Sequence, residues 1–129
     1  MEKPKVIDTS ALYPLVKKMG RKFADIVKEL VILDLTWYEV GNVIVKEANK
    51  GKIKNLEETA LIWQEILSAI KTEEVREIKE VAELAKKDKL TYYDAAYIYT
   101  ASKMSLKLIT EDQELKNKYQ KLCITINEL

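Results

Sequence analysis

The sequence predicts an α/β protein built as a three-layer α/β/α sandwich around a short, mostly parallel sheet. First, short apolar runs alternate with amphipathic segments of ten or more residues, which is the pattern of βαβ units. Second, the 129 residues are 47% hydrophobic, so one chain of this length can bury a real core. Third, two prolines and three glycines leave no linker and no long mobile lid. We therefore expect one domain over residues 1–129.

The first elements follow from local signals. The apolar run Lys5–Asp8 ends in an acid and predicts a buried strand. Thr9 or Ser10 can cap a helix over Ala11–Lys18, and Gly20 can end it.

The next segment repeats the pattern. Phe23–Leu30 is short and amphipathic, and Val31–Leu35 reads as the second strand. Apolar residues at helical spacing predict a helix from Thr36 to about Lys50, which Gly51 closes.

The second half of the chain supplies the other helices and strands. We predict a helix opened by Asn55, a strand near Lys71–Val75, helices over Glu77–Lys87 and Thr91–Met104, a strand over Leu106–Thr110, a short helix over Asp112–Tyr119 and a last strand over Cys123–Ile126.

Composition excludes several kinds of chemistry. The chain has no histidine, which removes Ser-His-Asp and Cys-His catalysis and histidine-ligated zinc. It has a single cysteine, Cys123, and so has no intrachain disulfide and no cysteine-rich metal site. With 22 basic and 21 acidic residues, the net charge of +1 excludes a polybasic binder that relies on bulk charge. Chemistry is left to carboxylates, lysines, tyrosines, hydroxyls or a metal held by oxygen.

The amino-terminal segment does not read as a targeting signal. Asp8 interrupts its only apolar stretch, and basic residues return at Lys17. No apolar run reaches the roughly 18–20 residues that a membrane helix needs. We expect a cytoplasmic protein that does not bind membranes.

Three acids are expected where parallel sheets usually carry their sites, at the carboxyl ends of strands, and a fourth can join them. Asp8 ends the first predicted strand, and Asp112 follows the strand over Leu106–Thr110. Glu39 lies in the first turn of the helix after the second strand. Asp94 opens its own helix and joins the others if that helix begins on the same side.

Ordinary capping explains each acid on its own. Thr36-x-x-Glu39 reads as a capping box, and Thr91-x-x-Asp94 resembles one. Asp112 can cap the last helix, and Asp8 can accept backbone N–H bonds. The acids gain functional weight only if a fold brings them together.

Four stretches of the chain carry a family resemblance: Val6–Leu12, Leu35–Val43, Leu90–Tyr97 and Leu108–Asp112. They resemble the PIN domain family and, within it, the toxin nucleases of VapBC toxin–antitoxin modules. The stretches occur in family order with family-like spacing, and the resemblance covers essentially the whole chain.

The resemblance implies which side chains form the site. The acids of the four motifs converge on divalent metal in the family, and the hydroxyls beside them support the site. In this sequence the acids are Asp8, Glu39, Asp94 and Asp112, and the hydroxyls are Thr9, Ser10 and Thr110. Glu111 stands where the family often has a small residue, and the Thr-x-Asp spacing favours Asp112 over it.

Carboxylates that cluster repel one another, and Mg²⁺ or Mn²⁺ relieves that repulsion. A metal lowers the pKa of the water it binds, and that water can attack a phosphodiester. We therefore expect a metal-dependent endoribonuclease. Asp8 and Asp94 would be the principal ligands, and Glu39 and Asp112 would complete the shell directly or through water.

The leading interpretation is a VapC-like toxin with RNA as substrate, a VapB-like antitoxin as partner and a homodimer as its assembly. A second interpretation is a PIN-fold nuclease that processes RNA without an antitoxin. A third is a non-catalytic α/β binding module of the receiver type, although that class needs an acidic pair where Thr9 and Ser10 follow Asp8. On the helix of Asp94, Tyr93 and Tyr97 share a face that we assign to the core or a dimer surface.

Overall fold

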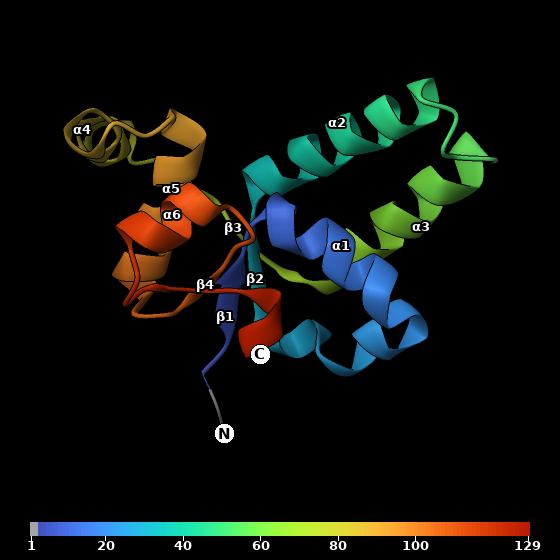
Figure 1. The fold of residues 1–129 in the computed structure, drawn as a ribbon, viewed down its shortest axis with the longest axis horizontal. Helices are drawn as coiled ribbons and strands as arrows, with labels where there is room; N and C mark the ends of the chain where they lie inside the picture. Colours follow the sequence, from blue (N-terminus) through green and yellow to red (C-terminus); the bar gives the residue numbers. More distant parts are fainter. Residues whose placement is uncertain (1–2) are drawn as a thin grey trace.

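The computed structural model describes residues 3–129, and its centre is a sheet of short parallel strands (Figure 1). The strands lie in the order β3-β2-β1-β4-β5. Every neighbouring pair is parallel, which confirms the predicted sheet. Their bounds are β1 Lys5–Ile7, β2 Leu30–Leu33, β3 Lys71–Glu73, β4 Leu108–Ile109 and β5 Cys123–Ile124.

Helices connect the strands and cover both faces of the sheet. The α-helices are α1 Thr9–Met19, α2 Asp34–Asn49, α3 Leu56–Ala69, α4 Ile78–Asp88, α5 Tyr92–Met104 and α6 Gln113–Lys118. Three short 3₁₀ helices complete the described chain: η1 Gly20–Asp25, η2 Val27–Glu29 and η3 Ile126–Glu128.

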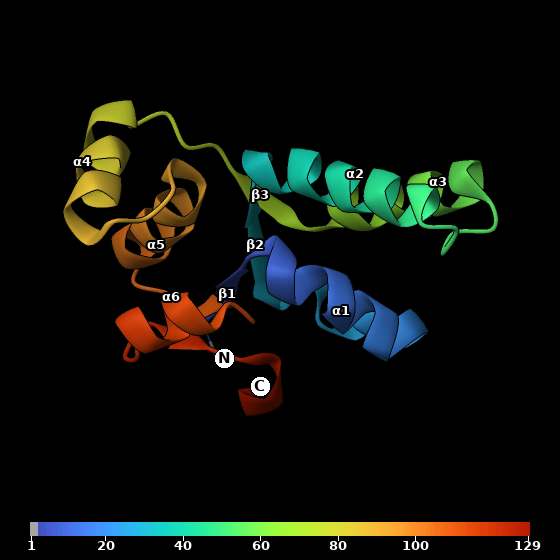
Figure 2. The same ribbon diagram turned by 45° about the horizontal axis from the view of Figure 1, so that its top comes forward.

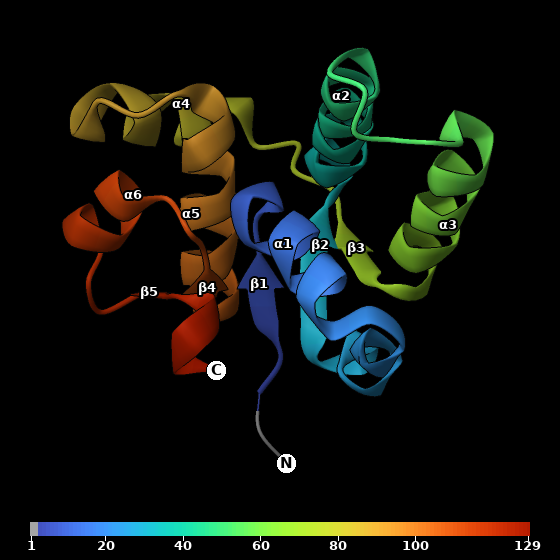
Figure 3. The ribbon, with the colours of Figure 1, turned by 45° about the vertical axis from the view of Figure 1, so that its right-hand side comes forward.

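Side chains alternate across the sheet and so build two cores. Val6 stands in register with Val31 and Leu108, and all three face α4, α5 and α6. Ile7 and Ile109 point the other way, toward α1, α2 and α3. Because both faces are covered there, β2 and β4 are apolar throughout, whereas the edge strand β3 is polar and partly exposed. Figure 3 shows the two groups of helices on opposite sides of the strands, which confirms the three-layer sandwich.

An aromatic and ionic contact ties the helices of one face together. The Tyr13 ring stacks on Trp63 with 4.7 Å between ring centroids and 5° between planes. The Tyr13 hydroxyl donates to Glu47 at 2.9 Å, and Lys17 pairs with the same carboxylate at 3.0 Å. Figure 2 shows the result, with α2 and α3 side by side and α1 beneath them.

The strand order reverses direction at one place in the sheet. From β1 the chain builds outward through β2 and β3, then crosses back to place β4 on the other side of β1. Connections therefore leave the carboxyl ends of β1 and β4 in opposite directions, and such a point is where open α/β sheets bind ligands. Asp8 follows β1, and Asp112 lies three residues after the end of β4.

Several boundaries differ from the predicted ones. The helix predicted from Thr36 begins at Asp34, so Thr36 lies inside its first turn. The stretch Phe23–Leu30 forms two 3₁₀ turns and the start of a strand instead of one amphipathic segment. These turns follow Gly20, whose φ of +55° ends α1 in the left-handed region that favours glycine. Within residues 3–129, no helix is both long and apolar enough to span a membrane.

Candidate functional site

Asp8 is buried at the end of β1 and is held by three donors. Ser10 Oγ donates to its Oδ1 at 2.6 Å, and the Ala11 amide donates to the same oxygen at 3.2 Å. Thr110 Oγ1 donates to Oδ2 at 2.5 Å across the gap between β1 and β4. Asp8 thus caps α1 with one oxygen and joins two strand ends with the other.

The Thr110 hydroxyl is the centre of this corner. It is fully buried, and it accepts the Asp112 amide at 3.1 Å while donating to Asp8. Ser10 Oγ lies 3.3 Å from it and accepts the Glu111 amide at 3.0 Å. Two of the three predicted supporting hydroxyls therefore hold Asp8 against the loop that carries Asp112.

The third hydroxyl, Thr9, serves Glu39 instead. Its Oγ1 donates to Glu39 Oε1 at 2.9 Å, and Tyr97 OH donates to the same oxygen at 2.6 Å. Glu39 was expected in the first turn of its helix, but it lies in the second because α2 begins at Asp34. The predicted Thr36–Glu39 capping box is wrong for the same reason. The Leu33 amide instead donates to Thr36 Oγ1 at 3.1 Å.

Asp94 lies in the first turn of α5, half-buried among the other acids. Thr91 caps this helix by accepting the Asp94 amide at 3.0 Å, as its spacing predicted. Burial raises the pKa of Asp94, and repulsion from Asp112 and Glu39 raises it further. These charges act on Asp94 only if it lies near the acids that carry them. The amino end of α5 is therefore at the same end of the sheet as the other acids. This was the condition that the sequence left open.

Asp112 caps α6 and faces Asp94. Its Oδ1 accepts the amides of Glu114 and Leu115 at 2.9 and 3.1 Å, so Oδ2 is the oxygen that capping does not use. Glu114, an acid that the sequence analysis did not single out, also repels Asp94.

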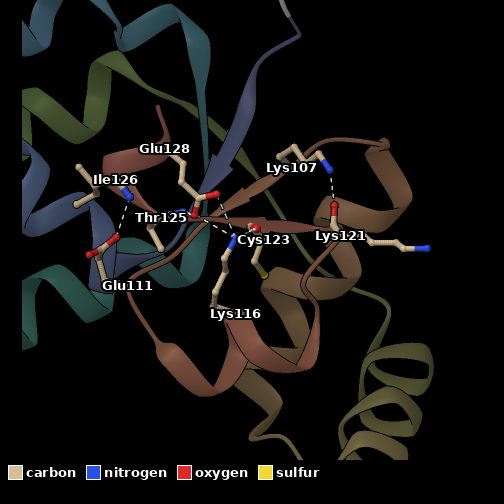
Figure 4. Close-up of polar contacts among 8 residues, drawn as sticks. All are labelled: Lys107, Glu111, Lys116, Lys121, Cys123, Thr125, Ile126 and Glu128. Atoms are coloured by element: carbon tan, nitrogen blue, oxygen red, sulfur yellow. Dashed lines mark hydrogen bonds and ion pairs between the residues drawn. The ribbon is translucent and has the colours of Figure 1, made fainter.

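Glu111 reaches toward the carboxyl-terminal residues, and Figure 4 shows its side chain beside Ile126. Its Oε2 accepts the Ile126 amide at 2.8 Å, which binds it to the carboxyl-terminal turn η3. Nearby, Lys116 donates to the Cys123 carbonyl at 2.7 Å and pairs with Glu128 at 3.0 Å. The side chain of Glu111 is therefore engaged at η3, whereas Asp112 Oδ1 is engaged in capping α6.

The electrostatics show that this corner concentrates negative charge. Burial raises the pKa of Asp8 to about 6 despite its hydrogen bonds, and the Asp94 charge adds to the rise. Repulsion links Asp94 to Asp8, to Asp112 and to Glu39. The four predicted acids are thus linked electrostatically through Asp94, which repels each of the other three.

The donor set suits a hard cation that keeps part of its water. Carboxylate oxygens are the ligands that Mg²⁺ and Mn²⁺ prefer. In the described part of the chain, no three acidic side chains are placed closely enough to hold one ion together. One or two carboxylates with several waters is the usual protein site for Mg²⁺, and this arrangement fits it.

Tyr97 was predicted to lie in the core or on a dimer surface, and its contact with the site was not predicted. Its side chain is 2% exposed, which confirms the core assignment, and its hydroxyl reaches Glu39. Tyr93, on the same predicted face, is 57% exposed. The signal available in the sequence was spacing, because Tyr97 follows Asp94 by three residues and so lies one turn further along the same side of α5.

Comparison with known proteins agrees with this architecture. The family model of the PIN domain matches residues 5–121. The chain is 37% identical over 113 residues to exonuclease VapC9 of Pyrobaculum aerophilum, covering 88% of this chain and 84% of that protein. It is 33% identical over 125 residues to ribonuclease VapC3 of the same organism, covering 91% and 95%.

Solved structures give the same result. The crystal structure of PAE2754 from Pyrobaculum aerophilum superposes with a TM-score of 0.86 at 33% identity, covering 98% of this chain and 91% of that one. A toxin–antitoxin complex from Klebsiella pneumoniae matches with a TM-score of 0.62 at 22% identity, covering 94% and 96%, and shares the fold. The chain therefore belongs to the PIN domain family, among its VapC-type members.

Proposed function

We propose that this protein is a metal-dependent endoribonuclease that hydrolyses RNA phosphodiester bonds, and that it is the toxin of a VapBC-type pair. One observation carries the proposal: Asp94 lies close enough to Asp8, Glu39 and Asp112 for each of these carboxylates to repel it. The chain has no histidine to do this chemistry another way. The names of its relatives, an exonuclease and a ribonuclease of VapC type, support nuclease activity.

We infer Mg²⁺, with Mn²⁺ as the alternative, as the cofactor. Asp8 and Asp94 would be its principal ligands, and Glu39 and Asp112 would complete the shell directly or through water. When bound, the ion supplies positive charge that stabilises the phosphate oxygens during hydrolysis.

The side chains of the site would accept the proton from the attacking water and orient the reacting groups. In hydrolysis, a water oxygen bonds to phosphorus while one phosphorus–oxygen ester bond breaks, and the water proton needs an acceptor. An ionised carboxylate of the cluster can take that proton. Ser10 is exposed beside Asp8 and can orient the water or a phosphate oxygen, while Thr110 keeps Asp8 in place.

The proposed partners follow from VapC-type membership. We infer that a VapB-like antitoxin blocks the acidic corner, that the protein acts in the cytoplasm and that it forms a homodimer. Light scattering during gel filtration tests the dimer. We expect a mass of twice the 14.9 kDa of the chain. Co-purification with the product of a neighbouring small gene tests the antitoxin.

A circular single-stranded RNA tests the central activity, because only an endonuclease can open it. The purified protein would be incubated with this RNA in Mg²⁺, in Mn²⁺ and in EDTA, and the product resolved on a denaturing gel. We expect linear RNA with either metal and intact circles in EDTA. Asp8→Asn and Asp94→Asn should each lower the rate at least 100-fold.

Asp25→Asn is the matched control, because Asp25 is an exposed acid in η1 outside the cluster. It should cleave as the unchanged protein does. Cleavage of a linear RNA but not of the circle would replace the endonuclease with an exonuclease. Cleavage that survives Asp8→Asn would refute the site, and an antitoxin-free preparation that leaves both RNAs intact would favour the binding module.

A further inference from the structure

A chain of hydrogen bonds runs through the buried space behind Glu39. The Leu33 amide donates to Thr36 Oγ1 at 3.1 Å, and Thr36 Oγ1 lies 2.7 Å from Tyr97 OH. Tyr97 OH in turn donates to Glu39 Oε1 at 2.6 Å. Since the phenol proton is used for the carboxylate, the Thr36 hydroxyl must donate to the phenol oxygen.

This chain has only one direction. An amide N–H can only donate, and an ionised carboxylate can only accept. Each hydroxyl between them therefore donates its hydrogen bond in the direction of Glu39. The Thr36 and Tyr97 side chains are buried, so water does not compete for these bonds. A hydrogen bond to an ionised group is roughly twice as strong as a neutral one, which makes the last link the strongest.

The network distinguishes the two oxygens of Glu39. Thr9 Oγ1 and Tyr97 OH both donate to Oε1. Across residues 3–129, no hydrogen bond to Oε2 is found. Thr9 lies in α1, Glu39 in α2 and Tyr97 in α5. The Glu39 carboxylate is therefore held by side chains from helices that pack in the two cores.

We propose that Tyr97 is a positioning residue that, with Thr9, holds Glu39 by Oε1 and leaves Oε2 to bind the metal ion or a water of its shell. This inference rests on the proposed function, because it requires Glu39 to serve the metal site. Tyr97 itself does not touch metal or RNA. It leaves Glu39 one oxygen for the metal. Because the Glu39 side chain is already ordered, less conformational entropy is lost when the ion binds.

Tyr97→Phe removes the hydroxyl and keeps the ring that fills the core. Mn²⁺ affinity would be measured by isothermal titration calorimetry on the full chain, with RNA absent. Loss of a group that orients a metal ligand typically costs 10–100-fold in metal affinity. We therefore expect Tyr97→Phe to bind Mn²⁺ 10–100-fold more weakly. Tyr93→Phe, an exposed tyrosine on the same helix, should bind it as the unchanged protein does.

A kinetic measurement separates positioning from general damage to the fold. Cleavage by Tyr97→Phe should be slow at low Mn²⁺ and recover toward the unchanged rate at saturating Mn²⁺. If Tyr97→Phe does not fold by circular dichroism, Thr9→Val removes the other donor to Oε1 and should also weaken Mn²⁺ binding.

The outcomes separate the inference from the function on which it depends. If the unchanged protein binds Mn²⁺ and folded Tyr97→Phe binds it equally well, the positioning role is refuted and the nuclease proposal stands. If the unchanged protein does not bind Mn²⁺ and does not cleave RNA, the proposed function fails and this inference fails with it.

Discussion

At the scale of single residues, the acids of this site are structural and functional at once. Asp8 and Asp112 each cap a helix with Oδ1, as simple capping signals predict. Each then has a second oxygen on the side of the acidic corner, and in Asp8 that oxygen accepts Thr110. Capping therefore fixes the direction of these carboxylates, and it is no argument against their proposed chemistry.

The buried Asp8 predicts an unusual pH dependence of stability. Its pKa is about 6 in the folded chain, against a usual value of 3.8. The folded state therefore holds this proton more tightly, and the stability it contributes is complete below about pH 4. That contribution is lost as the pH rises through about 6, by at most about 3 kcal/mol.

Urea unfolding in EDTA at pH 4 and pH 7.5 measures this effect. Asp8→Asn has no proton to lose, so it should lose less stability over this range than the unchanged protein does. Equal losses in the two proteins would show that Asp8 is not the group responsible.

At the scale of elements, Glu111 connects the loop of the site to the carboxyl-terminal turn η3. Its side chain accepts the Ile126 amide (Figure 4). Its own amide donates to Ser10. Glu111→Ala removes the acceptor and should lower the free energy of unfolding by about 1 kcal/mol. Glu111→Gln keeps a carbonyl oxygen for Ile126 and should lose less than half of that amount.

Urea unfolding of both variants at pH 7 checks this role, and Mn²⁺ titration distinguishes it from metal binding. We expect Mn²⁺ affinity within about twofold of the unchanged protein in Glu111→Gln. A tenfold loss in Glu111→Gln would instead mean that Glu111 acts as a metal ligand.

Elements also show what the sequence could predict. The alternation of short apolar runs with amphipathic stretches predicted the α-helices and the central strands, because the strands β1, β2 and β4 are buried between two cores. Their ends were less accurate. The spacing predicted Thr36 as a cap, but its hydroxyl accepts the Leu33 amide, three residues before the predicted start. Which residue begins a helix depends on such backbone partners, and the side-chain pattern does not contain them.

At the scale of the whole molecule, the strand order determines which distant residues come close together, and no local sequence pattern contains this information. The four acids lie far apart in the chain, and strand order alone brings β1 and β4 together. The resemblance to the PIN family predicted that meeting, whereas spacing could not. Tyr97 shows the remaining gap, because its hydroxyl reaches Glu39 of α2 only in the folded chain, so its core role could be predicted from the sequence and its partner could not.

The claim that these acids form one metal site is tested most directly by crystals of the protein grown in Mn²⁺. Anomalous difference density measured near the manganese edge locates the ion without reference to activity. The account predicts a peak between Asp8 and Asp94, within direct or water-mediated reach of Asp112 and Glu39. Density only at other acids, or no peak from a protein that cleaves RNA in the same Mn²⁺, would contradict it.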